Sequence, residues 1–408
     1  MQYDVIVVGA GPSGAVLSYL LAEKGFKILT LEKLSPGKDK PCGGGLTYKT
    51  TKLLKDIGLE LPEELKEVEA TGFEIVHEKD SIMDEENFPL ITLIRRKKFD
   101  MFLMEQATDY GASVHYNEEV VRVKTGSNKV NVITKSGESY VGTIVVGAGG
   151  ASDIVGRELG FRRSWKADEL GVAIVTESFV GQQFIKEKFS NPWRVILFLS
   201  GIKGGYSWLF PKREHLNLGV GSFVFARPNL LRSIEYTQRF FGFRLENARF
   251  RGHILPLGGK KRKLVSNNAL LVGDAAGLID PFSGEGIYYA IKSSEIAMQV
   301  IEKAFEENRF DSGFLKTYEK RIWNELGFDL MLAARAARWV YTAPLKAIEL
   351  VKQNKELVKV IVDILTGEKP YRMHKKVILK LPIYAAKWIT RFRKRKSAQK
   401  SVNFREHI

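Results

Sequence analysis

Apolar and amphipathic stretches alternate at the start of the chain. Tyr3–Val8 is dominated by Val and Ile, which predicts a buried parallel strand. A predicted helix, Ser13–Glu23, follows it, and Lys27–Leu31 is a second apolar run. Strand, helix and strand in this order predict a βαβ unit and therefore an α/β fold built on a parallel sheet.

Later patterns predict two further kinds of structure. Helices are expected at Thr47–Ile57 and up to Tyr110, and from Asp311 onward the chain reads as almost wholly helical. Short β-rich segments fill most of the middle. They comprise strands at Thr71–Val76 and Leu90–Ile94, a predicted meander of Val114–Tyr116, Val120–Lys124, Val130–Thr134 and Tyr140–Val146, and an antiparallel set of Leu170–Phe179, Val195–Leu199, Tyr206–Phe210 and Leu216–Phe223.

Glycines punctuate the first βαβ unit where a dinucleotide would bind. The run Gly9–Gly14 reads Gly-x-Gly-x-x-Gly between the strand and the helix, so the backbone can approach a pyrophosphate at the helix N-terminus. Glu32 closes the second strand, where a carboxylate accepts from ribose hydroxyls. An acid here favours FAD or NAD over NADP. The candidate contacts are Gly9, Gly11, Pro12, Ser13, Gly14, Glu32 and Lys33.

A second motif decides between the two dinucleotides. Ala269–Gly277 is an apolar strand ending in Gly273-Asp274, and it continues through Pro281 to Gly284-Glu285-Gly286-Ile287. This resembles the second FAD fingerprint of the glutathione-reductase-like flavoproteins, in their hydroxylase branch. The resemblance implies that Asp274 binds the ribityl chain and that Gly284, Gly286 and Ile287 open a helix aimed at the isoalloxazine. A helix N-terminus stabilises the anionic N1–C2=O end of reduced flavin.

Two weaker signals lie between these motifs. Arg96–Asp100 resembles the family's Arg-x-x-Phe-Asp, in which the Arg packs on FAD, although an Arg in a basic run is usually only solvated. Gly147–Asp153 resembles Gly-Ala-Asp-Gly-x-x-Ser, but Gly149 replaces the Asp and Asp153 replaces the Ser. Side-chain contacts from this turn to FAD or a nicotinamide are therefore not expected. Arg96 and Val121 complete the candidate cofactor contacts.

Two further motifs narrow the resemblance. Pro41-Cys42-Gly43-Gly44 follows the second strand, and Tyr206-Ser207-Trp208-Leu209-Phe210-Pro211 lies in the predicted antiparallel sheet, with Lys212 after it. Together with both fingerprints they resemble the geranylgeranyl reductase family, over roughly residues 1–330. The resemblance implies a Rossmann-like FAD-binding domain of the p-hydroxybenzoate hydroxylase type. The implied parts are an FAD domain (1–70, 95–165, 265–310), an interleaved substrate sheet domain (71–94, 166–264) and a helical C-terminal region with a basic tail (311–408).

The candidate catalytic residues are Cys42, Tyr206, Trp208, Gly284 and Gly286. Tyr206 and Trp208 alternate with Ser207, so both rings face one side, as core or as the wall of an apolar channel for an isoprenoid chain. Cys42 is either a small buried hydrophobe or a neighbour of the flavin ring. By resemblance, hydride from reduced FAD saturates C=C bonds of a prenyl lipid, and the proton donor is not identified.

The sequence leaves competing functions open. A monooxygenase or halogenase of the same fold would instead use a flavin–oxygen adduct, and a non-catalytic, membrane-docked flavoprotein would form no product. Beyond the opening motif no second Gly-x-Gly-x-x-Gly lies between a strand and a helix, so no dedicated NAD(P)H domain is expected. The electron donor, whether NAD(P)H, ferredoxin or a reductase, is not specified.

Composition limits the remaining possibilities. Among 408 residues there is one cysteine, which excludes a disulfide framework and an iron–sulfur cluster, and no metal site is expected. The fold begins too early for a signal peptide, and no run of about 18 apolar residues appears. We therefore expect a cytoplasmic protein, either free or peripheral on the inner face of the membrane.

Positive charge is concentrated at the C-terminal end. Residues 371–408 carry twelve Lys and Arg against one acidic residue, Glu406, out of a formal net charge of +16. Trp388, Phe392 and aliphatic residues are interleaved, which favours an interfacial helix on anionic membrane. The alternatives are a packed helix with a solvated basic end and nucleic-acid binding. No nucleic-acid module accompanies the charge, so no nucleic acid is expected as a partner.

Overall fold

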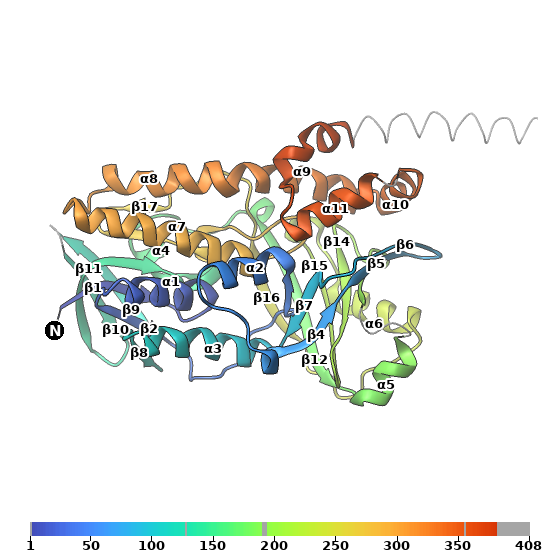
Figure 1. Ribbon diagram of the computed structural model, residues 1–408, viewed down its shortest axis with the longest axis horizontal. Helices are drawn as coiled ribbons and strands as arrows, with labels where there is room; N and C mark the ends of the chain where they lie inside the picture. The colour runs from blue at the N-terminus through green and yellow to red at the C-terminus, as the bar shows by residue number, and fades with distance from the viewer. Residues whose placement is uncertain (1, 127–128, 190–193, 355, 382–408) are drawn as a thin grey trace, which may run out of the picture.

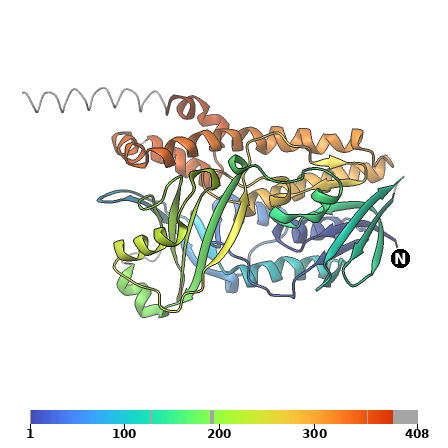
Figure 2. The ribbon, with the colours of Figure 1, turned by 180° about the vertical axis from the view of Figure 1, so that it is seen from behind.

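The computed structural model describes residues 2–126, 129–189, 194–354 and 356–381. Two β-sheets lie toward opposite ends of the molecule, and the C-terminal helices run along one side of both (Figures 1 and 2). This architecture confirms the predicted fold class, an α/β fold joined to a largely antiparallel sheet and a helical C-terminal region.

The first sheet is built around a parallel centre. β1 (Gln2–Val8) pairs in parallel with β2 (Ile28–Glu32) on one side and β11 (Ser139–Gly147) on the other. β8 (Ser113–Tyr116) continues the parallel order beyond β2, and β18 (Ala269–Leu271) continues it beyond β11. Three antiparallel strands complete the sheet, namely β9 (Val120–Gly126), β10 (Lys129–Thr134) and β17 (Val265–Ser266).

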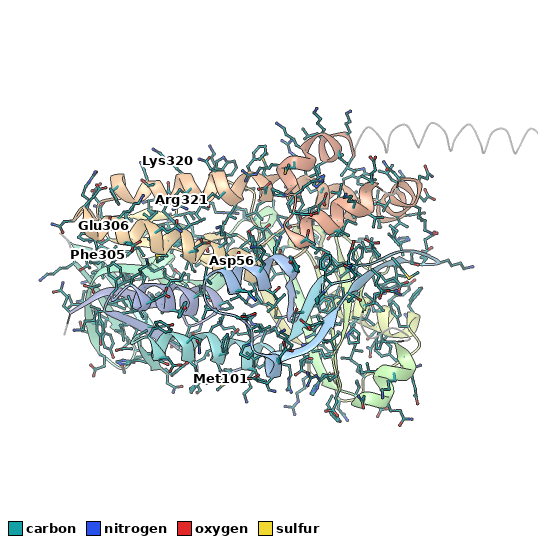
Figure 3. All side chains as sticks on the ribbon, in the orientation of Figure 1. Asp56, Met101, Phe305, Glu306, Lys320 and Arg321 are labelled. Atoms are coloured by element: carbon teal, nitrogen blue, oxygen red, sulfur yellow. The ribbon has the colours of Figure 1, made fainter. Side chains whose placement is uncertain are left out.

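Helices cover this sheet and close its core. α1 (Pro12–Glu23) packs against α3 (Arg96–Asp109) and α7 (Ile287–Glu306), and α8 (Ser312–Ile322) lies on α7. Lys320 and Glu306, on the outer surfaces of α8 and α7, are exposed (Figure 3). α1 is buried along almost its whole length between the sheet and its neighbouring helices, and α7 buries its apolar side chains mainly against α1, α2 and α8.

The predicted meander is wrong in its first strand. β8 is parallel to β2, and only β9, β10 and β11 form an antiparallel meander. β8 directly follows α3, and a strand that enters after a helical crossover runs parallel to its neighbour. Alternation of apolar residues does not encode this direction.

The second sheet is almost wholly antiparallel. Its order is β16-β12-β15-β14-β13-β5-β6, and every pair is antiparallel except β13 with β5. α5 (Gly181–Lys188) and α6 (Leu230–Phe240) pack on it. The strands are β5 (Gly72–His77), β6 (Asp80–Glu85), β12 (Leu170–Phe179), β13 (Arg194–Phe198), β14 (Gly205–Pro211), β15 (His215–Phe223) and β16 (Arg251–Pro256).

A small sheet joins the two halves. β3 (Gly45–Thr47), β7 (Ile91–Ile94) and β4 (Lys66–Ala70) pair in that order, and α2 (Tyr48–Asp56) follows β3 directly. Because β3 begins at Gly45, the Cys42–Gly44 segment is held where the sheets meet.

The C-terminal region is helical, as predicted. After α8, a π-helical turn at Trp323–Gly327 leads into α9 (Phe328–Thr342), α10 (Pro344–Gln353) and α11 (Glu356–Thr366). α10 lies against β5 and β6, and α11 lies against α2. No helix among the described residues is long and apolar enough to cross a membrane.

The predicted interfacial helix falls mostly outside the described residues. Its beginning, residues 371–381, packs on the body: Tyr371, Ile378 and Leu381 are buried beside α9 and α11. Arg372 pairs with Asp329 of α9. Residues 371–381 therefore match the alternative of a helix packed on the body of the protein. Residues 382–408, which carry the rest of the prediction, lie outside the described residues.

Candidate functional site

The first glycine turn has room only for glycine. Gly9 has φ of +111°, and a Cβ there would lie 2.5 Å from the Ala148 carbonyl oxygen. A Cβ on Gly14 would lie 1.9 Å from the Gly9 carbonyl oxygen. Gly11 is the N-cap of α1, and Pro12 is its first residue. The turn therefore has no Cβ atoms over its backbone at the positive end of α1, as the close approach of a pyrophosphate requires.

Lys40 adds a cation that the motif did not predict. Its Nζ lies 2.8 Å from the position that a Cβ on Gly11 would occupy. The ammonium group therefore lies directly over the turn. There the ammonium group and the positive end of the α1 dipole would both attract a phosphate. Lys40 immediately precedes the Pro41–Gly44 motif, which could have signalled this role.

Glu32 faces the same turn. Its Oε2 accepts from the Ala10 amide at 2.8 Å and its Oε1 accepts from the Leu34 amide at 3.0 Å. A carboxylate has about four lone-pair sites, so acceptor capacity remains for ribose hydroxyls. Lys33 is exposed, and Val121, near the start of β9, is 42% exposed. Their roles as cofactor contacts stay predictions.

The two fingerprints meet in space. A Cβ on Gly273 would lie 2.8 Å from Ser13 Oγ, and a Cβ on Gly286 would lie 3.4 Å from Asp274 Oδ1. Gly286 is the N-cap of α7, which begins at Ile287. The first turn of α7 therefore has amide groups without partners inside the helix, beside the Asp274 carboxylate. This is the arrangement expected for a flavin ribityl chain and ring.

The middle glycine turn departs from the family for a visible reason. Asp153 is buried and accepts from the Gly149 amide at 2.8 Å and the Gly156 amide at 2.6 Å, so it caps the short helix α4 (Ile154–Glu158). A Cβ on Gly149 would lie 2.9 Å from Asp153 Oδ2. The two departures are linked, because Asp153 occupies the space of a side chain at position 149.

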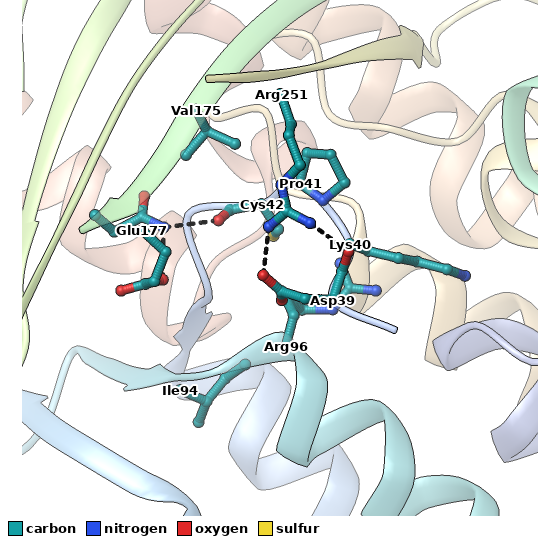
Figure 4. Close-up of a pocket in the computed structure, with 10 residues that line it drawn as sticks. Asp39, Lys40, Pro41, Cys42, Ile94, Arg96, Val175, Glu177 and Arg251 are labelled. Carbon is teal, nitrogen blue, oxygen red and sulfur yellow. Dashed lines mark hydrogen bonds and ion pairs between the residues drawn. The ribbon is translucent and has the colours of Figure 1, made fainter. Parts of the chain in front are cut away.

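A small pocket opens beside the Cys42 loop (Figure 4). Arg96 lines it at the start of α3, where its guanidinium pairs with Asp100 through two bonds of 2.8 Å and reaches the Cys42 thiol. Burial lowers the pKa of Arg96, but Asp100 and Cys42 outweigh this effect and the net shift is upward. Arg96 is not a solvated residue of a basic run. The lining residues are Asp39, Lys40, Pro41, Cys42, Ile94, Arg96, Val175, Glu177, Asn217 and Arg251.

The Cys42–Gly44 loop lies directly on the aromatic strand β14. A Cβ on Gly43 would lie 2.9 Å from the Phe210 ring and 3.3 Å from Trp208 Nε1. Asn217 of β15 joins the two motifs, because its Nδ2 donates to the Cys42 carbonyl at 2.9 Å and its Oδ1 accepts from Trp208 Nε1 at 2.7 Å. The Pro-Cys-Gly-Gly and Tyr-x-Trp-x-Phe-Pro motifs thus form one site.

A buried ion pair supports this junction. Lys212 is 1% exposed, and its Nζ donates to Glu177 Oε2 at 2.6 Å and to the Ile94 carbonyl at 2.8 Å. Glu177 Oε2 also accepts from Asn217 at 2.8 Å, whereas Glu177 Oε1 is buried without a partner in the described part of the chain. Sequence reasoning missed Glu177 and Asn217. Their signal was the one charged residue of β12 and an amide residue inside β15, each within a largely apolar strand.

The aromatic face of β14 is continuous, as the alternation predicts. Ring centroids lie 6.1 Å apart for Tyr206 and Trp208, and 6.4 Å apart for Trp208 and Phe210. Trp208 lies flat on Gly219, where any Cβ would clash at 2.1 Å. Burial raises the pKa of the Tyr206 phenol, so its hydroxyl stays protonated and donates to the Ser283 carbonyl.

The candidate catalytic residues are therefore neighbours. A Cβ on Gly284, whose φ is +71°, would lie 3.1 Å from the Tyr206 hydroxyl. This contact places the second FAD turn against the aromatic face, and the Cys42 loop closes the other side of Trp208. The described residues contain no group of three or more His, Cys, Asp and Glu placed to hold a metal ion.

The residues present fit FAD. The glycine turn and Lys40 suit a pyrophosphate, Glu32 suits the adenosine ribose, and Asp274 suits the ribityl chain. The unpartnered Glu177 Oε1 marks the Cys42 pocket as a place for a ligand that donates a hydrogen bond. The fold and this site together define an FAD-binding oxidoreductase.

Comparison with known proteins narrows this class. Residues 2–196 match the FAD binding domain family. The chain is 30% identical to an uncharacterised protein of Methanosarcina barkeri, over 83% of this chain and 84% of that protein. It is 28% identical to a digeranylgeranylglycerophospholipid reductase of Methanocaldococcus jannaschii, over 81% and 84%. A geranylgeranyl bacteriochlorophyll reductase-like protein from Thermoplasma acidophilum shares the fold, with a TM-score of 0.76, 24% identity and coverage of 93% and 95%.

The chain belongs to the geranylgeranyl reductase family of FAD-dependent oxidoreductases. Its cofactor is FAD. Membership accounts for the pairing of the two narrower motifs, which the structure brings into contact through Asn217 and Gly43.

Proposed function

We propose that this protein reduces C=C bonds of geranylgeranyl-type isoprenoid chains, in archaeal-type membrane lipid precursors or geranylgeranyl pyrophosphate. The observation that carries the proposal is the direct packing of the Cys42–Gly44 loop on Trp208 and Phe210. It places an aromatic, apolar face next to the flavin motifs, where a hydrocarbon chain would be reduced. The name of the reductase from Methanocaldococcus jannaschii supports the same substrate class.

The chain's own groups suit an unpolarised alkene. When bound, reduced FAD supplies the hydride. Tyr206 and Trp208 present ring faces, which stabilise positive charge that develops on the alkene carbons. Their polar atoms are already engaged, Trp208 Nε1 by Asn217 and the Tyr206 hydroxyl by Ser283. The face therefore excludes water and orients the chain by contact.

Anaerobic turnover tests the proposal. Dithionite-reduced protein is incubated with geranylgeranyl pyrophosphate or with an unsaturated archaeal-type ether lipid, and mass spectrometry counts the hydrogens added. We expect products heavier by two hydrogens for each bond reduced. Oxidised protein without dithionite is the control, and it should leave both lipids unchanged.

Other outcomes identify the alternatives. Substrate-dependent oxygen uptake by reduced protein, without reduced lipid, would favour a monooxygenase or halogenase. An absence of product with either lipid under both conditions would favour a non-catalytic flavoprotein. We also propose that reduction by NAD(P)H alone is slow, because the Gly149 turn offers no side-chain contact to a nicotinamide. Fast, saturable reduction by NADPH in stopped flow would contradict this.

A further inference from the structure

The loop in the second half of the second FAD fingerprint is fixed by four tyrosines from three parts of the chain. This loop, Asp280–Gly286, leads into α7 and carries the two glycines predicted to face the flavin. Two of the tyrosines, Tyr341 and Tyr371, belong to the C-terminal helical region, in which no flavin motif was recognised.

Asp280 fixes the amide side of the loop. It is fully buried, and its Oδ1 accepts from the Phe282 amide at 2.7 Å and from the Ser283 amide at 3.2 Å. Its backbone oxygen accepts from the Gly284 amide at 2.9 Å. Its second carboxyl oxygen accepts from the hydroxyls of Tyr289 at 3.1 Å and Tyr371 at 2.9 Å.

Tyrosine hydroxyls fix the carbonyl side. The Tyr341 hydroxyl donates to the Phe282 carbonyl, and the Tyr206 hydroxyl donates to the carbonyl of the next residue, Ser283. The two rings are 5.8 Å apart, and Phe282 stacks on Tyr341 with centroids 6.0 Å apart at an interplanar angle of 16°. Consecutive peptide groups of the loop are thereby held on both sides.

We propose that Tyr341 and Tyr371 are positioning residues of the FAD site, so that the C-terminal helical region completes that site. Tyr341 acts through the Phe282 carbonyl and Tyr371 acts through the Asp280 carboxylate. Both set the position of Gly284 and Gly286, and hence the amide groups at the start of α7. The proposal takes FAD as the cofactor and does not depend on which substrate is reduced.

The protonation states suit this role. Burial raises the pKa of both phenols well above the ordinary value, and Asp280 raises them further. Both groups therefore remain hydrogen-bond donors at neutral pH. Burial also raises the pKa of Asp280, an effect that Lys49 opposes. The other charged and titratable groups near Asp280 are Glu285, Tyr206 and Tyr289.

Tyr341→Phe and Tyr371→Phe each remove one hydroxyl and keep the ring. Tyr140→Phe is the control, because Tyr140 lies at the start of β11 and its hydroxyl donates to Glu118 at 3.3 Å, at the opposite end of that strand from the Gly147 turn. FAD affinity of the apo-proteins is measured by calorimetry, and the flavin midpoint potential of the loaded proteins by spectroelectrochemistry. All three variants should lose a similar, small amount of thermal stability.

We expect Tyr341→Phe and Tyr371→Phe to weaken FAD binding by between about twofold and tenfold, the range for loss of one hydrogen bond, and to shift the midpoint potential. Tyr140→Phe should change neither quantity. The proposal is overturned if both loop variants match Tyr140→Phe in FAD affinity and in potential. If the wild-type protein binds FAD but reduces no prenyl lipid, the proposed function is refuted. The comparison of FAD affinity and midpoint potential among the variants would still test the role of Tyr341 and Tyr371.

Discussion

Replacement of Lys212 by Met tests whether the polar junction holds the two motifs together. The Lys212 side chain is 0% exposed, and its Nζ is 2.6 Å from Glu177 and 2.8 Å from the Ile94 carbonyl. Met keeps the aliphatic stem but leaves the partly buried Glu177 carboxylate without its cation, so that Asn217 is its remaining donor, and removes the lysine from the Ile94 carbonyl. Breaking a buried pair by removing one partner costs about 3–5 kcal/mol.

Urea unfolding of the FAD-loaded protein, followed by circular dichroism, measures this cost. Lys212→Met should lower the midpoint strongly, and Lys212→Met/Glu177→Gln should recover part of the loss, because the second change removes the stranded charge. Lys55→Met is the control, since Lys55 and its partner Glu60 are 66% and 69% exposed, and its midpoint should not move. If Lys212→Met behaves like Lys55→Met, the junction does not stabilise the fold.

Four further outcomes follow from the geometry. Asp274→Ala should weaken FAD binding by calorimetry, with an unchanged circular dichroism spectrum, because it removes a charge-assisted hydrogen bond worth about 1.5–3 kcal/mol. Trp208→Ala should raise KM for geranylgeranyl pyrophosphate more than it weakens FAD binding, since it removes apolar contact worth about 1.5–3 kcal/mol. Trp323→Ala, on the π-helical turn, is the control and should leave this KM unchanged. Because burial raises the pKa of Asp280, its contribution to stability is full below the unfolded pKa of about 3.9 and is lost as pH rises through the folded pKa; Asp280→Asn should flatten that decline in urea midpoints measured from about pH 4 upward. The full chain should co-sediment with anionic vesicles at low salt and a chain ending at Leu381 should not; equal behaviour would show that the basic tail does not bind membrane.

Local patterns predicted the parts of the fold that depend on local chemistry. The strand–glycine–helix units at Gly9 and Gly273 need backbone in special conformations, and few residues other than glycine fit. The alternation of Tyr206, Ser207 and Trp208 correctly placed both rings on one face. These features are encoded within about ten residues of each other, so sequence alone was sufficient.

Pairings across long sequence distances could not be predicted in the same way. β8 reads like the strands that follow it, yet it pairs with β2 because a helical crossover precedes it. α5 and α6 were missed because they interrupt the run of strands of one sheet; α6 is amphipathic along its eleven residues, so its pattern was present in the sequence. The roles of Glu177 and Asn217 depend on strands β12 and β15 being adjacent, which no local pattern indicates.

The distribution of polar groups around β14 argues for an apolar substrate. Ser207 points away from the aromatic face and accepts from Thr237 at 2.9 Å behind the sheet. On the face itself, the indole N–H of Trp208 is bound by Asn217 and the hydroxyl of Tyr206 by Ser283. A site that recognises a phenol or another polar ring needs free donors or acceptors to bind the polar group of that substrate. When a substrate lacks the polar group, those donors or acceptors stay unpaired and binding is weakened. Here the polar atoms of both rings are satisfied by the protein, so what they offer a substrate is ring surface, which suits a hydrocarbon chain better than the polar substrates of a hydroxylase.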